Sequence, residues 1–168
     1  MKNLFATLFC MLVALTFAYS QNPPASPRVT AENGNIKIVY GQPSKKGRVI
    51  FGAEGSQSLE KYGKVWRTGA NEATVITFKK DGKLGGKDVK AGDYAFFTIP
   101  GEKEWVIILN SEVKQWGAYN YKQDKDVLRV TVPATTSASP VEKLTIEAKD
   151  NAIVLGWDTA GFSVPVKF

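Results

Sequence analysis

The sequence predicts an all-β protein, an antiparallel β-sandwich of two sheets with a jelly-roll or immunoglobulin-like arrangement. Three observations lead to this prediction. Short segments that alternate apolar and polar residues recur along the chain, separated by Gly, Pro and Asn turns. Almost no segment has the 3.6-residue apolar period of a helix. Asn33-Gly34 joins two alternating segments, as in a two-residue hairpin. A closed β-barrel is the alternative.

The alternation defines each strand in turn. Ile36, Ile38 and Tyr40 share one face of the second strand, and both faces of the segment 105–109 are apolar, so this strand should be central. Pro165 interrupts the last strand and suggests an edge position. The expected strands cover residues 28–32, 35–41, 48–51, 73–78, 87–90, 94–99, 105–109, 127–132, 144–148, 153–157 and 162–168.

Two segments are expected to be something other than strand. Residues 56–61 could form a single helical turn, and the Ala, Thr and Ser residues of 134–140 read as a loop inside the domain. The inward residues of the strands should form one core. They are Ile36, Ile38, Phe51, Ile76, Phe78, Phe96, Ile107, Leu109, Leu128, Val130, Leu144, Ile146, Leu155, Trp157, Val164 and Val166.

The N-terminus predicts export. Lys2 precedes an apolar run over residues 4–17, and Ala18-Tyr19-Ser20 places small residues at the −3 and −1 positions of a cleavage before Gln21. The run is short for a transmembrane span, although an uncleaved anchor is the alternative. We therefore expect a signal peptide over 1–20, a Pro-rich leader over 21–27 and one domain over 28–168, in the periplasm or outside the cell.

Composition excludes several kinds of chemistry for a cleaved chain. Cys10, Met1 and Met11 all precede the cleavage position, and the sequence has no His. Disulfides, thiol nucleophiles, Ser-His-Asp triads and zinc sites built from Cys or His are thereby excluded. The sequence also lacks an Asp-rich calcium loop, so we expect no metal and no cofactor.

The net charge of +6 does not predict nucleic-acid binding. Most Lys residues alternate with acidic residues, which is typical of a solvated strand surface. Only residues 45–48 form a basic cluster, whereas a nucleic-acid interface gathers many cations on one face. The oligomeric state cannot be predicted from these patterns.

Polar and aromatic residues gather around the segment 62–78, where an irregular stretch leads into a strand. Such loops fixed to strands often carry binding groups. Arg presents a planar fork of donors to carboxylates, and flat aromatic rings stack on sugars. We therefore predict a site at one end of the sandwich for a glycan, a peptide or another anionic or polyhydroxyl small ligand. The candidate ligand-binding residues are Tyr40, Arg48, Trp66, Arg67, Asn71, Glu72, Trp116, Tyr119 and Tyr121.

Two other interpretations stay open. Arg67 and Glu72 could pair to hold a loop on the sandwich, in a structural or envelope-assembly protein without a pocket. A carboxylate hydrolase would need a second acid about 5–9.5 Å from Glu72. Asp124, Asp126 and Asp158 are conceivable partners for it. No residue is assigned a catalytic role.

Four sequence motifs carry a resemblance to a known family. They are residues 40–52, 65–74, 91–94 with 99–105, and 116–121, which read YGQPSKKGRVIFG, VWRTGANEAT, AGDY with IPGEKEW, and WGAYNY. Together they resemble a family of secreted bacterial proteins known only as a domain of unknown function. The resemblance covers nearly the whole chain after the signal and implies a single secreted domain without an established activity. It supplies no catalytic residues.

Overall fold

The computed structural model of the protein describes residues 26–168, and the predicted signal peptide lies outside them. The fold is all-β, as predicted, and none of these residues forms a helix long and apolar enough to cross a membrane. The elements are β1 (Arg28–Glu32), β2 (Ile36–Gly41), β3 (Phe51–Gly52), β4 (Glu60–Lys61), β5 (Thr74–Phe78), β6 (Gly82–Leu84), β7 (Lys87–Val89), β8 (Gly92–Ile99), β9 (Glu104–Asn110), the 3₁₀ helix η1 (Gln123–Lys125), β10 (Asp126–Ala148) and β11 (Ala152–Lys167).

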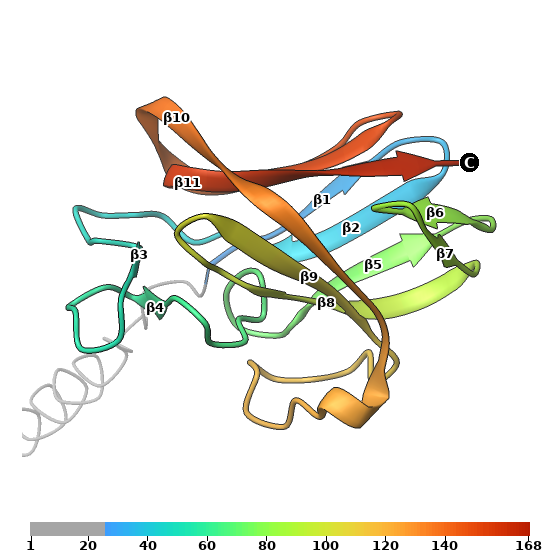
Figure 1. Ribbon diagram of the computed structural model, residues 1–168, viewed down its shortest axis with the longest axis horizontal. Helices are drawn as coiled ribbons and strands as arrows, with labels where there is room; N and C mark the ends of the chain where they lie inside the picture. Colours follow the sequence, from blue (N-terminus) through green and yellow to red (C-terminus); the bar gives the residue numbers. More distant parts are fainter. Residues whose placement is uncertain (1–25) are drawn as a thin grey trace, which may run out of the picture.

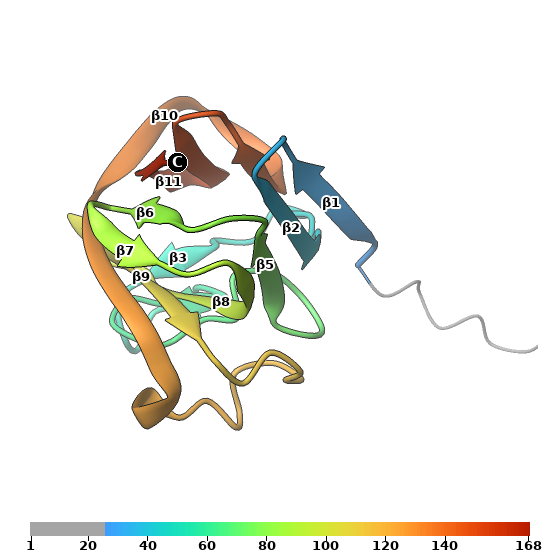
Figure 2. The same ribbon diagram turned by 90° about the vertical axis from the view of Figure 1, so that its right-hand side faces the viewer.

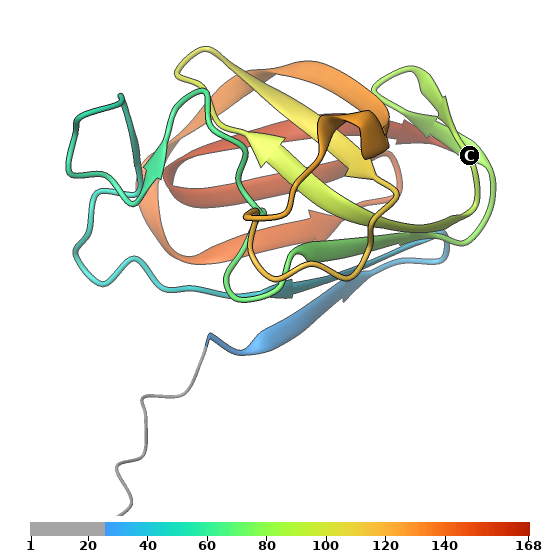
Figure 3. The ribbon, with the colours of Figure 1, turned by 90° about the horizontal axis from the view of Figure 1, so that it is seen from below.

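Nine strands form one antiparallel sheet in the order β1-β2-β5-β8-β9-β10-β11-β6-β7 (Figure 1). The predicted Asn33-Gly34 hairpin joins β1 to β2, with Val29 opposite Tyr40. The short strands β3 and β4 pair in parallel as a separate sheet. Within the described residues the large sheet has β1 and β7 as its two edges, so it is not a closed barrel. Seen from below, β1 runs along the outside of the molecule (Figure 3).

The large sheet folds over into two layers, which gives the sandwich-like fold. In Figure 2, β11 and the later part of β10 lie above β5, β8 and β9. Hydrogen bonds join the later part of β10 to the β1–β2 hairpin. The Ile146 N–H donates to the Tyr40 hydroxyl (3.1 Å), and Asn33 Nδ2 donates to the carbonyl of Lys149, the residue just after β10 (2.9 Å). The layers therefore enclose one main core.

All sixteen residues predicted for the core are buried. The centre is more aromatic than the alternation indicated. The Phe51 ring makes edge contacts with Trp66, Trp105 and Trp157, with ring centroids 5.1–6.0 Å apart. Trp66 and Trp157 stack at 5.9 Å. Aromatic rings of this size bury large apolar areas, which suits a fold without disulfides among its described residues.

The prediction for β9 is confirmed. It lies between β8 and β10, and Trp105, Ile107, Ile108 and Leu109 are completely buried. The edge position of Pro165 is wrong, because β11 pairs with β10 over residues 153–162 and with β6 at Val166 and Lys167, and the Gly85 N–H donates to the Pro165 carbonyl (2.8 Å). The proline is tolerated there because residue 165 serves as the acceptor of the bond from the Gly85 N–H, and a proline keeps its carbonyl.

The last two strands are longer than predicted. β10 includes the predicted loop 134–140, which is strand in the structure, although its register with β11 shifts between Thr136 and Val141. β11 joins two predicted strands and turns at Asp158, which has a φ of 55°. Its two halves lie side by side, because the Val166 N–H donates to the Asn151 carbonyl (2.9 Å).

The predicted helical turn at 56–61 is also wrong. Backbone groups of this segment bond to the preceding segment instead of to each other. The Leu59 N–H donates to the Val49 carbonyl and the Glu60 N–H to the Ile50 carbonyl, at 2.9 and 2.8 Å. The strand predicted at 48–51 shrinks to Phe51–Gly52, and η1 was not predicted.

Candidate functional site

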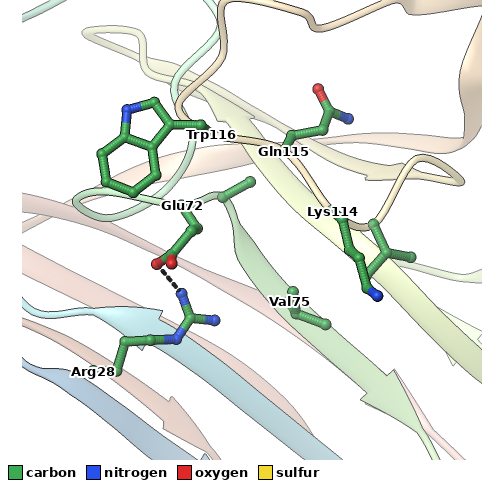
Figure 4. A pocket seen from close by; sticks show the side chains of 8 residues that line it. Arg28, Glu72, Val75, Lys114, Gln115 and Trp116 are labelled. Carbon is green, nitrogen blue, oxygen red and sulfur yellow. Dashed lines mark hydrogen bonds and ion pairs between the residues drawn. The ribbon is translucent and has the colours of Figure 1, made fainter.

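An open groove of about 410 Å³ lies beside the start of β5 (Figure 4). We call it the Trp116 groove. Its walls come from β1, from the start of β5 and from the loop over residues 111–122 that joins β9 to η1. The lining residues are Arg28, Glu72, Ala73, Val75, Val113, Lys114, Gln115 and Trp116.

Backbone hydrogen bonds fix this loop to the segment before β5. The Ala73 N–H donates to the Gln115 carbonyl (2.9 Å), and the Gly117 N–H donates to the Asn71 carbonyl (3.0 Å). Asn71 has a φ of 64°, a left-handed conformation that Asn adopts more readily than most residues. The resulting bridge sets Glu72 opposite Trp116. The indole is thereby held at the rim of the groove.

A buried polar network shapes the loop from below. Asn110 Nδ2 donates to Asp126 Oδ1 (2.9 Å), and the Tyr121 hydroxyl donates to Asp126 Oδ2 (2.6 Å). Gln115 Nε2 donates to the Glu112 carbonyl (2.7 Å). Burial of the Tyr121 phenol, reinforced by its bond to the Asp126 carboxylate, raises the pKa of Tyr121 well above its ordinary value. The phenol that anchors the end of the loop therefore keeps its proton near neutral pH.

The groove carries more positive than negative charge. Arg28 Nη1 and Glu72 Oε2 form an ion pair at 2.6 Å that is partly open to solvent. Lys114 is exposed and has no carboxylate within 4.0 Å in the part of the chain that the structure describes. Figure 4 shows Arg28 and Lys114 on opposite sides of Val75. The groove thus joins an apolar floor, an exposed indole and an ammonium group without a partner among the described residues.

The structure brings together only some of the predicted site residues. Glu72 and Trp116 line the groove, and Asn71 supports it through its backbone while its Nδ2 donates to the Ser26 carbonyl (3.2 Å). Tyr119 belongs to the same loop and is 83% exposed. Tyr121 also belongs to it, but its ring packs against Phe97 at 5.1 Å and its hydroxyl is used by Asp126.

The other four predicted residues lie elsewhere. Tyr40 and Trp66 are buried in the core, where neither can contact a ligand. Arg48 holds the turn before β3, because its Nε donates to the Lys45 carbonyl (2.9 Å) and its Nη2 to the Ser44 carbonyl (2.6 Å). Arg67 has a buried Nε and lies outside the groove lining, and Glu72 forms its ion pair with Arg28. Of Arg48, Arg67, Asn71 and Glu72, which were expected to share one site, only Glu72 lines the Trp116 groove.

Sequence reasoning missed Arg28 and Lys114. Arg28 reaches Glu72 because β2 pairs with β1 on one side and β5 on the other, an order that no local pattern encodes. Lys114 stands two residues before Trp116, and this pairing of a cation with an aromatic residue was a usable signal. The surrounding loop was recognised only from residue 116 onward.

A second catalytic acid is not found among the described residues that line the groove. Glu72 is the only carboxylate there. Asp126 is bonded to Asn110 and Tyr121, and Asp158 pairs with Lys45 at 2.6 Å. In residues 26–168 no group of three or more Asp, Glu, Cys or His side chains is placed to hold a metal ion. The residues that do line the groove are suited to binding by stacking and charge.

Comparison with known proteins identifies a family. No curated protein and no solved structure shows significant similarity to the chain. A family model described as a protein of unknown function, DUF2911, matches residues 22–166, which is nearly the whole chain. The protein belongs to the DUF2911 family.

Proposed function

We propose that the protein is an exported binding module whose Trp116 groove takes an anionic polyhydroxyl ligand, such as an acidic oligosaccharide. The observation that carries the proposal is the contrast among the four Trp residues. Trp66, Trp105 and Trp157 are at most 2% exposed, whereas Trp116 is 61% exposed at the rim of a groove. A large aromatic side chain kept in solvent by a well-bonded loop is a common feature of binding surfaces.

The groove's other residues support the class of ligand. An exposed indole stacks on the C–H face of a sugar ring, as aromatic rings do with apolar surfaces. Lys114 supplies a charge that the described residues leave without a counter-ion, and it attracts a carboxylate. Arg28 donates from Nη1 to Glu72. Because a guanidinium has five N–H groups, Arg28 keeps further donors for a ligand. Ala73, Val75 and Val113 supply the apolar floor.

The test uses the fluorescence of Trp116. Because the other three indoles are buried, a water-soluble quencher such as acrylamide acts mainly on Trp116. We expect oligogalacturonate to protect this emission from acrylamide, and neutral oligosaccharides to protect it less. Trp116→Phe should remove the quenchable component while the circular dichroism spectrum stays unchanged.

Lys114→Gln tests the charge. It should weaken oligogalacturonate binding about tenfold or more, the usual effect of losing a charge-assisted hydrogen bond. Lys103→Gln is the matched control, since Lys103 is also exposed and lies outside the groove. If neither acidic nor neutral oligosaccharides protect Trp116 at millimolar concentration, the proposed ligand class is wrong. Equal affinity of Lys114→Gln and Lys103→Gln would remove the role assigned to Lys114.

A further inference from the structure

The outer edge of β1 has no strand beside it in the described part of the chain. β1 pairs only with β2, and Figures 2 and 3 show it on the outside of the molecule. An edge strand exposes a row of backbone donors and acceptors that another strand can use. A strand that pairs with β1 must match this row of backbone groups and the side chains beside it.

The hydrogen-bond pattern shows which residues face outward. The Gln42 N–H donates to the Pro27 carbonyl (2.8 Å), and the Asn33 N–H donates to the Ile36 carbonyl (2.9 Å). Bonded pairs alternate along an antiparallel ladder, so the odd-numbered residues of β1 bond to β2. Arg28, Thr30 and Glu32 therefore direct their N–H and C=O groups toward the open edge.

The side chains on this edge complement a second copy of the same strand. Arg28, Thr30 and Glu32 are exposed, and Thr30 lies midway between opposite charges. If two β1 strands pair antiparallel about a twofold axis at Thr30, each Arg28 lies opposite a Glu32. All three outward-facing residues then exchange backbone hydrogen bonds, and opposite charges on paired strands stabilise the pairing.

The alternatives within the same edge fit less well. Moving the register by two residues leaves fewer outward-facing residues paired and separates Arg28 from Glu32. Pairing centred on Arg28 or on Glu32 sets like charges opposite each other. On the inner face the central register places Val29 opposite Ala31, and both side chains already pack against the core. The twofold register centred on Thr30 pairs all the outward backbone groups, sets opposite charges side by side and keeps the apolar side chains on the inner face.

We propose that the protein self-associates through antiparallel pairing of β1 with β1 of a second copy, which joins the two large sheets into one. The pairing involves one five-residue strand from each copy. Such an interface is smaller than that of most permanent dimers, so the dimer should be weak and reversible. This proposal does not depend on what the Trp116 groove binds.

Sedimentation velocity of the cleaved chain provides the first test. We expect a monomer at about 1 µM and a growing dimer fraction toward about 1 mM, consistent with a small interface. Thr30→Pro should reduce the dimer, because it removes the central outward N–H and leaves the bonds from β1 to β2 in place. A wild-type chain that stays monomeric over the whole range overturns the proposal.

Charge reversal tests the register. Arg28→Glu sets two acidic side chains opposite each other across the pair, and Glu32→Lys sets two basic side chains opposite each other. Each variant alone should therefore dimerise at least tenfold more weakly than the wild type. A mixture of the two variants should form a heterodimer, because in one of its two charged pairs both signs are reversed and in the other both charges are the native ones. Glu102→Lys, at an exposed residue outside β1, should leave association unchanged.

Restoration of the dimer on mixing Arg28→Glu with Glu32→Lys distinguishes pairing at the β1 edge from other effects of the two substitutions. In the mixed dimer the two introduced side chains face each other, and the native Arg28 of one copy faces the native Glu32 of the other, so both pairs are of opposite sign. Arg28→Glu also removes the ion pair with Glu72, but that loss cannot be repaired by a second molecule carrying Glu32→Lys. If dimers form and the single variants do not weaken them, or if mixing fails to restore them, the β1 edge is not the interface.

Discussion

Glu60 is a described residue whose carboxyl pKa is raised far above its ordinary value. Burial raises the pKa of Glu60 from 4.5 to about 7, although the charges of Arg67 and Lys61 act in the opposite direction. The native state therefore binds the Glu60 proton more tightly than the unfolded chain does. Stability from this residue is fully present below about pH 4.5 and is lost as the pH rises through about 7.

Glu60→Gln should remove this pH dependence, because glutamine resembles the protonated side chain and carries no charge. At pH 8 we expect the variant to unfold with a free energy about 1–3 kcal/mol higher than the wild type. At pH 4.5 the two should differ little. Urea unfolding at both pH values measures the difference, with Glu102→Gln as an exposed control. If the free energy of unfolding of the wild type and that of Glu60→Gln change with pH in the same way between pH 5 and 8, the Glu60 carboxyl is solvated.

At the scale of single residues, residue type alone did not separate core from site. Tyr40 shares the face of Ile36 and Ile38, and the alternation already placed that face inward. Trp66 and Trp116 both stand in irregular segments, yet only Trp116 is exposed. Trp66 is drawn inward by backbone bonds between residue 66 and Thr98, at 2.7 and 3.0 Å, which involve strand β8 more than thirty residues away. Such a contact leaves no local signal.

At the scale of elements, β9 is the most buried strand, with five of its seven residues buried. Ile107 is completely buried and lies between Thr98 of β8 and Val130 of β10. Ile107→Ala should cost about 2–5 kcal/mol through lost burial and the cavity it leaves. Val127→Ala, at a residue that is 53% exposed, should cost less than about 0.5 kcal/mol. Chemical unfolding measures both. A loss at Ile107 as small as that at Val127 would contradict burial on both faces.

The strands that the sequence predicted well are those with their own turn signals. Residues 28–32 match β1, and β5, β8 and β9 differ from prediction by at most two residues at either end. The less successful predictions concern β10 and β11, where small residues continue a strand through a change of register. The parallel pair β3–β4 was also missed, since each strand has only two residues and depends on a distant partner.

At the scale of the whole molecule, the groove results from sheet order. The chain reaches it three times, at residue 28, at residues 72–75 and at residues 113–116. The sequence pattern predicted Glu72 and Trp116 as binding residues, but it did not predict Arg28 or residues 113–115. What brings them beside Arg28 is the order β1-β2-β5 and the bonds from the 111–122 loop to residues 71 and 73. Alternation predicts strands and faces, but it does not predict which strands become neighbours.

The N-terminal pattern of the whole chain predicts export. We expect cleavage before Gln21 and recovery of the protein from the envelope or the culture medium. Intact mass of the protein from the producing cells gives the first readout. Thiol alkylation after denaturation gives the second, because Cys10 is the only cysteine and lies before the cleavage position. The cleaved chain should therefore gain no mass from iodoacetamide.

An Ala18→Tyr variant, with a bulky residue at the −3 position, should keep its N-terminus and gain one alkyl group. A cytoplasmic wild-type chain that begins at Met1 and is alkylated at Cys10 would contradict export and, with it, an extracytoplasmic ligand for the Trp116 groove.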